Sequence, residues 1–445
     1  MNERTYTALK SIFSFETFFV LFLFSPQFKS AYPFSLAPNL SLLLAIILLA
    51  WFVILYRKCP EINVLTLETS AFLVFSGWCL VSSFWVDRTT YSISKALCFG
   101  VYTVPAFFMA YCIIGTNQHR LKRFLYAIGI LSFWVHLASY KDLILSHWHR
   151  VDVLGANYLV TGQTLGFGFI CLCLLSFFLL KECEKQGNEG QECEKQGSEE
   201  GAIAEKKALR QRFVFWLLML VCGSTATIQL HLGGRGPVLG LLLTLMYFYI
   251  YGARHGNARL CGKHFFTVSL TCFLSYFFVS WLFDTQTCSF VSRASRIIFP
   301  QEIAPNTFAM DESLGLRLEY YESALALFLK HPLLGVGFGG WAHLHDTLYH
   351  YVPEPHDLRD VFWRHPHNIG LEVLVETGLV GSLLGIWCGA LVFRKIVFKR
   401  LIHSFLDAAP ILLLIFSFFN ALKSGDLNDN ILFFVMAGII AAKKK

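Results

Sequence analysis

The sequence predicts an all-α protein that crosses a membrane many times. Of its 445 residues, 55% are hydrophobic and only 15% are charged, whereas soluble proteins are roughly 25% charged. Long apolar segments run through the whole chain without the alternation of a membrane barrel. Helices suit lipid because they satisfy their own backbone polar groups. We therefore expect residues 1–445 to form a single integral membrane domain.

A spanning helix needs about 20 mainly apolar residues, and this criterion predicts about twelve helices. They are expected near residues 11–28, 38–56, 64–85, 94–114, 122–140, 159–180, 213–232, 237–252, 264–284, 368–393, 405–422 and 428–442. A long polar loop, 285–366, separates the ninth helix from the tenth. We expect this loop to contain short helices that lie in the membrane interface.

Lys and Arg predict the orientation, because the cytoplasmic loops of membrane proteins carry an excess of positive charge. With the N-terminus inside, the inside segments hold 24 of the 37 Lys and Arg residues. The loop 285–366 then faces outward, with six basic and nine acidic residues. Both termini are expected in the cytoplasm. The net charge of +7 therefore indicates membrane orientation and not nucleic-acid binding.

The inside segment 181–212 is expected to be a flexible cytoplasmic loop. Within it, Glu182–Gly187 recurs as Glu192–Gly197, and the polar, glycine-rich composition is typical of solvated loops. The repeat has no Cys-x-x-Cys spacing, so metal binding is not predicted there. Most of the thirteen cysteines lie in apolar segments, where Cys acts as a small hydrophobic residue. No disulfide framework is predicted.

Arg235 is a first candidate site residue, because charges at a membrane boundary are costly. The turn His231–Pro237 between two expected helices is very short, and Pro237 suits the first turn of a helix. Arg235 would then lie beside a helix N-terminus, which favours anions. The alternative for Arg235 is an arginine that only extends to lipid phosphates.

Arg317 is a second candidate, in the outside loop. It follows helical spacing with Tyr321, Ala324 and Phe328 in a segment too short to span the membrane. Four glycines between 335 and 340 then allow the backbone to turn close to a ligand. The alternative for Arg317 is an amphipathic helix whose arginine only faces water.

His367 is the candidate catalytic base. It lies at the start of the tenth expected helix, with Asn368 available as a cap. The positive end of a helix disfavours imidazolium, so we expect the neutral imidazole that a general base requires. A histidine that only caps a helix is the alternative.

Zinc is a further alternative, because seven of the fifteen histidines fall in the outside region and form two His-x-His pairs. No clear third ligand or glutamate base with metalloenzyme spacing accompanies them. We therefore expect metal-independent chemistry without a cofactor.

Three of these residues lie in motifs that resemble the bacterial O-antigen ligase and O-antigen polymerase superfamily. His367-Asn368, followed after nine residues by Gly378–Gly381, is similar to the family's signature. Arg235-x-x-x-Leu239 is similar to its short arginine motif.

The resemblance extends to two further segments. Arg317 and the later Lys330–Gly339 are similar to the family's loop arginine and the turn after it, and Ser83–Asp87 also resembles the family. The topology matches throughout, but the specific motifs lie mainly in 235–381.

The resemblance implies a GT-C-like fold and an inverting glycosyltransferase. A sugar chain on undecaprenyl diphosphate would be transferred at the periplasmic face of the bacterial inner membrane. Arg235 and Arg317 would hold the diphosphate, and His367 would activate the acceptor hydroxyl. Glu376 and Asp426 are candidate residues of the same pocket, with an ordinary solvated turn as the alternative for Asp426.

O-antigen ligase, which joins the glycan to lipid A–core, is the leading prediction. O-antigen polymerase, with a lipid-linked glycan as acceptor, is the alternative. A protein O-oligosaccharyltransferase is less favoured, because many continue into a soluble C-terminal domain and this sequence stops after 443–445. A multispan transporter would predict broken helices and charges at mid-membrane depth, whereas these candidates cluster at one face.

Overall fold

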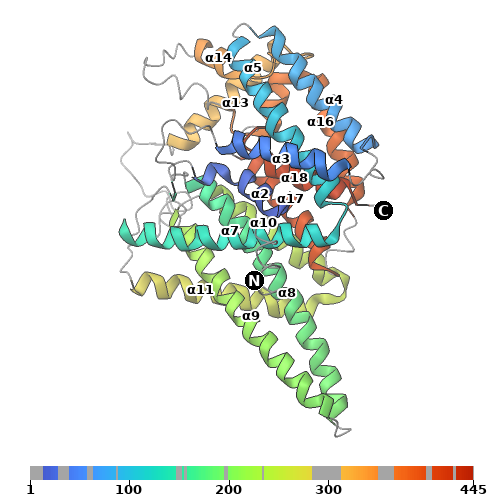
Figure 1. Cartoon of the computed structure of the whole chain (residues 1–445). Coiled ribbons are helices and arrows are strands. Elements are labelled where there is room, and N and C mark those ends of the chain that lie inside the picture. The colour runs from blue at the N-terminus through green and yellow to red at the C-terminus, as the bar shows by residue number, and fades with distance from the viewer. Residues whose placement is uncertain are drawn as a thin grey trace, which may run out of the picture.

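A computed structural model shows a protein built of helices (Figure 1). It describes residues 14–28, 40–57, 64–86, 89–146, 153–154, 158–194, 199–232, 235–282, 312–348, 365–396, 403–423 and 427–443. These residues contain no β-strand, so the all-α class is confirmed. Of the outside loop, 283–311 and 349–364 lie outside the described residues.

The helices follow one another along the chain with short connections. They are α2 (Phe15–Leu23), α3 (Leu40–Arg57), α4 (Leu67–Ser82), α5 (Thr89–Cys98), α6 (Val104–Met109), α7 (Gln118–Leu145), α8 (Tyr158–Glu194), α9 (Glu199–Leu232), α10 (Arg235–Gly252), α11 (Ala258–Leu282), α13 (Glu312–Lys330), α14 (Gly340–Leu348), α16 (Ile369–Lys395), α17 (Phe405–Ala421) and α18 (Ile431–Ala441). Short 3₁₀ or π turns are η1 (Ser25–Phe28), η2 (Ser83–Trp85), η3 (Phe99–Thr103), η4 (Ala110–Ile114) and η5 (Ala253–Asn257).

Eight helices among the described residues are long and apolar enough to cross a membrane. One of them, Gly236–Trp281, covers two of the expected helices and bends at His255 and Gly256. The shorter apolar helices α17 and α18 occupy the last two expected segments, and α2 occupies part of the first. The multi-pass class is therefore confirmed, and the number twelve stays a prediction.

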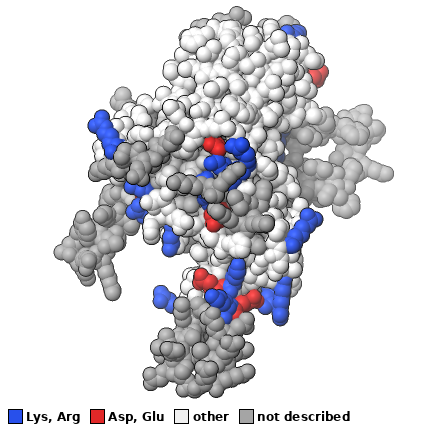
Figure 2. Space-filling view, turned by 90° about the vertical axis from the view of Figure 1, so that its right-hand side faces the viewer, with Lys and Arg blue, Asp and Glu red and all other residues white. Residues whose placement is uncertain are grey.

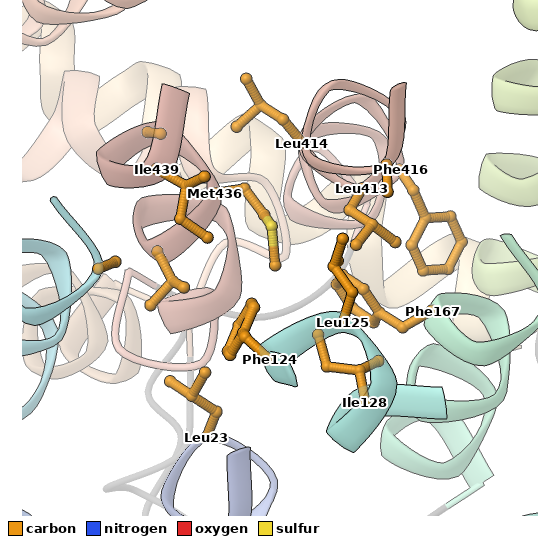
Figure 3. Packing of buried hydrophobic residues seen from close by; sticks show 14 of the residues in the cluster. Leu23, Phe124, Leu125, Ile128, Phe167, Leu413, Leu414, Phe416, Met436 and Ile439 are labelled. Carbon is orange, nitrogen blue, oxygen red and sulfur yellow. The ribbon is translucent and has the colours of Figure 1, made fainter. Parts of the chain in front are cut away.

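The last two helices lie at the centre of the protein. Met436 of α18 and Leu413 and Phe416 of α17 are completely buried, in one cluster with Phe124 of α7 (Figure 3). A helix that is apolar on all sides belongs in such a core. By contrast, α3 leaves many leucines and isoleucines exposed, such as Ile54 at 55%. Such a surface suits contact with lipid.

Ion pairs connect helix ends that the sequence predicts to lie on the same side. Glu16 contacts Arg123 (3.1 Å), and Glu68 contacts Lys395 (3.4 Å); all four are predicted inside. Figure 2, which views the right-hand side of Figure 1, shows mostly Lys and Arg among its charged side chains, below a nearly uncharged upper part. The alternation of helix direction is consistent with these contacts. The assignment of this side to the cytoplasm stays a prediction.

The segment 181–212, expected to be a flexible loop, is largely helical. Helix α8 continues to Glu194 and α9 begins at Glu199, so only 195–198 are outside the described backbone. The two helices form a hairpin that extends away from the body, on the side opposite α13 and α14 (Figure 1). The expectation failed because Glu, Lys, Gln and Ala are good helix formers, and their polarity alone does not prevent a helix.

Helix α16 is broken at Gly378, and a loop from the preceding segment fills the break. Gly378 has φ 65° and ψ −166°, a region that is essentially restricted to glycine. The carbonyls of Val375 and Glu376 accept hydrogen bonds from the backbone N–H groups of Val336 (2.9 Å) and Gly337 (2.8 Å).

The other backbone groups freed by the break are also paired. Leu379 donates its N–H to the Pro332 carbonyl (2.9 Å). Trp78 of α4 donates its Nε1–H to the Thr377 carbonyl (3.1 Å). Because unpaired backbone groups are costly away from water, these bonds fix the loop 332–337 against α16. The loop is thereby held between α13 and the first half of α16.

Replacing Gly378 with Ala should lower the melting temperature of the protein in detergent. An added Cβ would contact the Leu333 carbonyl, and the backbone conformation would cost on the order of 1–3 kcal/mol. The control is Gly389→Ala on the same helix, where no described atom lies within 4 Å of an added Cβ. Equal melting temperatures for the two variants would contradict this account of the break.

Candidate functional site

His367 directly precedes α16, in a backbone conformation that few residues adopt. Its φ is 54°, in the left-handed region. The next residue, Asn368, caps the helix, because its Oδ1 accepts hydrogen bonds from the N–H groups of Gly370 (2.9 Å) and Leu371 (3.1 Å). The predicted helix start with Asn368 as its cap is confirmed. This turn fixes where the His367 side chain leaves the backbone.

Two rings pack against the His367 imidazole. The Tyr320 ring of α13 lies nearly parallel to it, at 16° and with ring centroids 5.9 Å apart. The His365 ring lies closer, with centroids 4.2 Å apart, and His365 is buried. Nδ1 of His367 is buried without a hydrogen-bond partner among the described residues. Since buried polar atoms usually have a partner, this nitrogen is available to a bound hydroxyl.

A second group of side chains, from α14, holds Tyr320 in place. The Tyr320 ring meets Trp341 and His345 edge-on, with centroid distances of 5.4 and 4.9 Å. Trp341 is fully buried, and His345 Nδ1 is hydrogen-bonded to Ser323 Oγ of α13 (3.0 Å). The two helices of the outside loop thus form a packed unit against the histidine.

The surroundings of His367 keep its imidazole neutral. Burial lowers its pKa from the ordinary value to about 3, with further lowering by His365 and by the positive charge of Arg317. The expected neutral state is therefore present. Its causes are burial and neighbouring groups, whereas the sequence argument relied on the helix end.

Arg317 lies on α13, which packs against α16. The electrostatic effect of Arg317 on the His367 pKa shows that the structure brings these two predicted residues near each other. Arg317 is partly exposed, so its guanidinium can meet both the imidazole and a ligand.

Arg235 is the first residue of α10, so the predicted helix start with Pro237 in its first turn is confirmed. The side chain of Arg235 lies outside the described ones. Next to it, a Cβ added to Gly236 would lie 2.9 Å from Lys423 Nζ, so a second cation approaches this helix start. The convergence of Arg235 and Arg317 on one diphosphate stays a prediction.

Glu376 is buried and bonded to a lysine that the sequence did not single out. Both of its carboxylate oxygens lie 2.9 Å from Lys95 Nζ, and Glu376 is 2% exposed. Its role as a pocket residue stays a prediction. Asp426 lies outside the described residues, but the adjacent Leu427 donates its N–H to Glu372 Oε2 (3.1 Å).

Lys95 and Glu372 are the main residues that sequence reasoning missed. Both lie inside apolar segments, where the cost of a buried charge could have identified them. Glu372 and Glu376 are also four residues apart, which places them on one helical face. Their pairing with Lys95 could not be predicted, because 277 residues separate Lys95 from Glu372.

Among the described residues, no group of three His, Cys, Asp or Glu side chains could hold a metal ion. Two of the outside histidines, His350 and His356, lie outside those residues. Metal-independent chemistry therefore stays a prediction.

These features define the class of protein: a multi-pass helical membrane protein with a histidine–arginine site at the start of α16. Residues 214–386 match the family model described as O-antigen ligase, and the chain belongs to the O-antigen ligase superfamily. The matched region includes Arg235, Arg317 and His367 but not Lys95. It supports a glycosyltransferase-like activity of ligase or polymerase type in O-antigen processing. No curated protein matches the chain.

His367 should keep its neutral form well below pH 6. The rate of histidine C2–H exchange with deuterium, followed by mass spectrometry, should change with a midpoint near pH 3, against about 6.5 for an ordinary histidine. Arg317→Gln should raise the midpoint because it removes a nearby positive charge. Arg394→Gln, at the other end of α16, should leave it unchanged. A midpoint near 6.5 in the unmodified protein would contradict the described site.

Proposed function

We propose that the protein is an O-antigen ligase. It transfers a glycan from undecaprenyl diphosphate to lipid A–core at the periplasmic face of the bacterial inner membrane. The observation that carries the proposal is the neutral His367 imidazole, whose buried Nδ1 has no partner among the described residues, beside the cationic Arg317. A base for a hydroxyl and a cation for a leaving phosphate are the two groups that this transfer needs.

The reaction is a single displacement at the anomeric carbon of the donor sugar. The acceptor oxygen attacks this carbon and loses its proton to His367. The new glycosidic bond forms as the bond from carbon to the diphosphate oxygen breaks, and undecaprenyl diphosphate leaves with that electron pair. One displacement inverts the anomeric configuration. Arg317 and Arg235 neutralise the negative charge that develops on the leaving group.

Donor binding also makes His367 a stronger base. In the free site the positive charge of Arg317 contributes to its low pKa, and a base of low pKa accepts a proton poorly. A diphosphate beside Arg317 offsets that charge and adds a negative one, which raises the imidazole pKa. The base is then strongest only when a donor is present, which limits reaction without substrate.

O-antigen polymerase is the alternative that uses the same donor and the same base. The two functions differ in the acceptor, which is lipid A–core for the ligase and a lipid-linked glycan for the polymerase. A deletion strain separates them. Loss of a ligase leaves long glycan on the undecaprenyl carrier, whereas loss of a polymerase leaves single-repeat chains on lipid A.

The break in α16 does not favour a transporter. Transporters use broken helices because the freed backbone groups bind the substrate or a coupling ion. In this protein the groups freed at Gly378 bond to the loop 332–337 and to Trp78, so they hold a loop. A protein O-oligosaccharyltransferase stays less favoured than the ligase and polymerase.

Ala at Arg235 or at Arg317 should abolish most glycan transfer while folding and membrane insertion persist. One lost contact to a developing charge costs about 2–4 kcal/mol, or roughly a hundredfold or more in rate. Lys should restore little activity, because an ammonium cannot form the two-pronged contact of a guanidinium. The assay uses purified protein, an undecaprenyl-diphosphate-linked glycan and lipid A–core. Normal rates in both Ala variants would remove the diphosphate site from the mechanism.

His367→Ala should lose most transfer and keep donor binding, because the arginines hold the diphosphate. General-base catalysis contributes about 10²–10⁴-fold. Donor binding and single-turnover transfer are measured separately, with and without EDTA. A loss of donor binding would make His367 a binding residue, and inhibition of the unmodified protein by EDTA would favour the zinc alternative.

A further inference from the structure

Lys95 is the centre of a buried cluster of charges that lies apart from His367. Its Nζ is 2.6 Å from Glu372 Oε1 and 2.9 Å from Glu376 Oε2. The three side chains are at most 4% exposed. Charges are costly to bury unless they are well paired, so a cluster of this kind inside a membrane protein indicates a role.

The cluster joins parts of the chain that are distant in sequence. Lys95 belongs to α5, and both glutamates lie on one face of the first half of α16. Glu372 also accepts the N–H of Leu427, and Asn428 donates to the Lys95 carbonyl (3.3 Å). The turn before α18 is thereby connected to the same lysine.

The cluster also reaches the loop that fills the break in α16. Lys95 Nζ lies 4.9 Å from the centre of the Phe338 ring, and Ser92, one turn earlier on α5, donates a hydrogen bond to the Phe338 carbonyl. Phe338 leads directly into α14, whose Trp341 packs against Tyr320. One neighbour of His367 is thus connected to Lys95 through this loop.

The second connection runs through the start of α16. The N–H of Glu372 donates to the carbonyl of Asn368 (2.9 Å), in the first turn of the helix. Asn368 is the cap and directly follows His367. The position of Glu372 therefore determines where the first turn of α16, and with it His367, is held.

We propose that Lys95, through Glu372 and Glu376, is a positioning group that fixes His367 in the site. Lys95 makes no contact with His367 among the described interactions, and it acts through the helix start and the Phe338 loop. The effect of Lys95 on glycan transfer rests on the proposed function. Its effect on the His367 environment does not.

The test compares two Lys→Met variants whose lysines contact carboxylates at opposite ends of α16. Lys95→Met removes the lysine of the cluster. Lys395→Met removes a lysine that contacts Glu68 (3.4 Å) at the far end of the helix. The first readout is the pH midpoint of C2–H exchange at His367, and the second is the split between kcat and the donor KM. Thermal unfolding confirms that each variant is folded.

Lys95→Met should raise the exchange midpoint of His367 by about one pH unit or more, because a loosened first turn admits water to the imidazole. It should lower kcat by on the order of tenfold to a hundredfold, since small misplacements of a reacting group have effects of this size. The donor KM should change little, and Lys395→Met should change neither readout.

If Lys95→Met does not fold, the variant Lys95→Met/Glu372→Gln/Glu376→Gln replaces it, because removing all three charges leaves none unpaired. The same midpoint shift is expected from it. A folded Lys95 variant with an unchanged midpoint overturns the positioning role, whatever happens to transfer. A raised donor KM with unchanged kcat also overturns it. A midpoint shift in a protein that transfers no glycan supports the positioning role and refutes the proposed function.

Discussion

The rest of the structure depends on one constraint, which is that backbone polar groups inside a membrane protein need partners within the protein. Continuous helices satisfy it along most of the chain. At Gly378 a helix stops satisfying it, and the loop 332–337 supplies the missing partners. The position of this loop is therefore set by backbone hydrogen bonds, which do not depend on side-chain packing.

The break thereby connects the two parts of the candidate site. Arg317 lies on the helix before the loop, and His367 lies at the start of the helix that the loop enters. A rigid connection between them fixes the separation between a cation and a neutral base. Preorganisation of this kind is what electrostatic catalysis requires, because groups that must move during a reaction stabilise its transition state less.

Electrostatics in the site depend on burial more than on formal charge. His367 lies beside a cation and a second histidine and is neutral for that reason. Lys95 lies beside two carboxylates, and its charge is balanced by them. The protein therefore keeps a neutral base and a paired lysine in neighbouring layers of the same helix. Each arrangement would fail if the two residues exchanged surroundings.

Much of the fold could be predicted from composition, because membrane helices require long apolar segments. The start of α16 at Asn368 and of α10 near Pro237 followed from local capping rules. The segment 181–212 did not, since polar residues are compatible with both a loop and a helix. Contacts across the chain, such as Lys95 with Glu372, depend on tertiary packing, which no local pattern encodes. The orientation of the site relative to the cytoplasm followed from Lys and Arg counts alone.

The contacts of Leu427 and Asn428 have a consequence for biosynthesis. Helices of a membrane protein emerge from the ribosome in chain order, so α5 and α16 are made before the turn at 427–428. Glu372 cannot gain its bond from Leu427, nor Lys95 its bond from Asn428, until that last turn has left the ribosome. A nascent chain that already contains both arginines and the histidine therefore still lacks the final support of its helix start. The site reaches its complete form only at the end of translation, when the whole protein is in the bilayer.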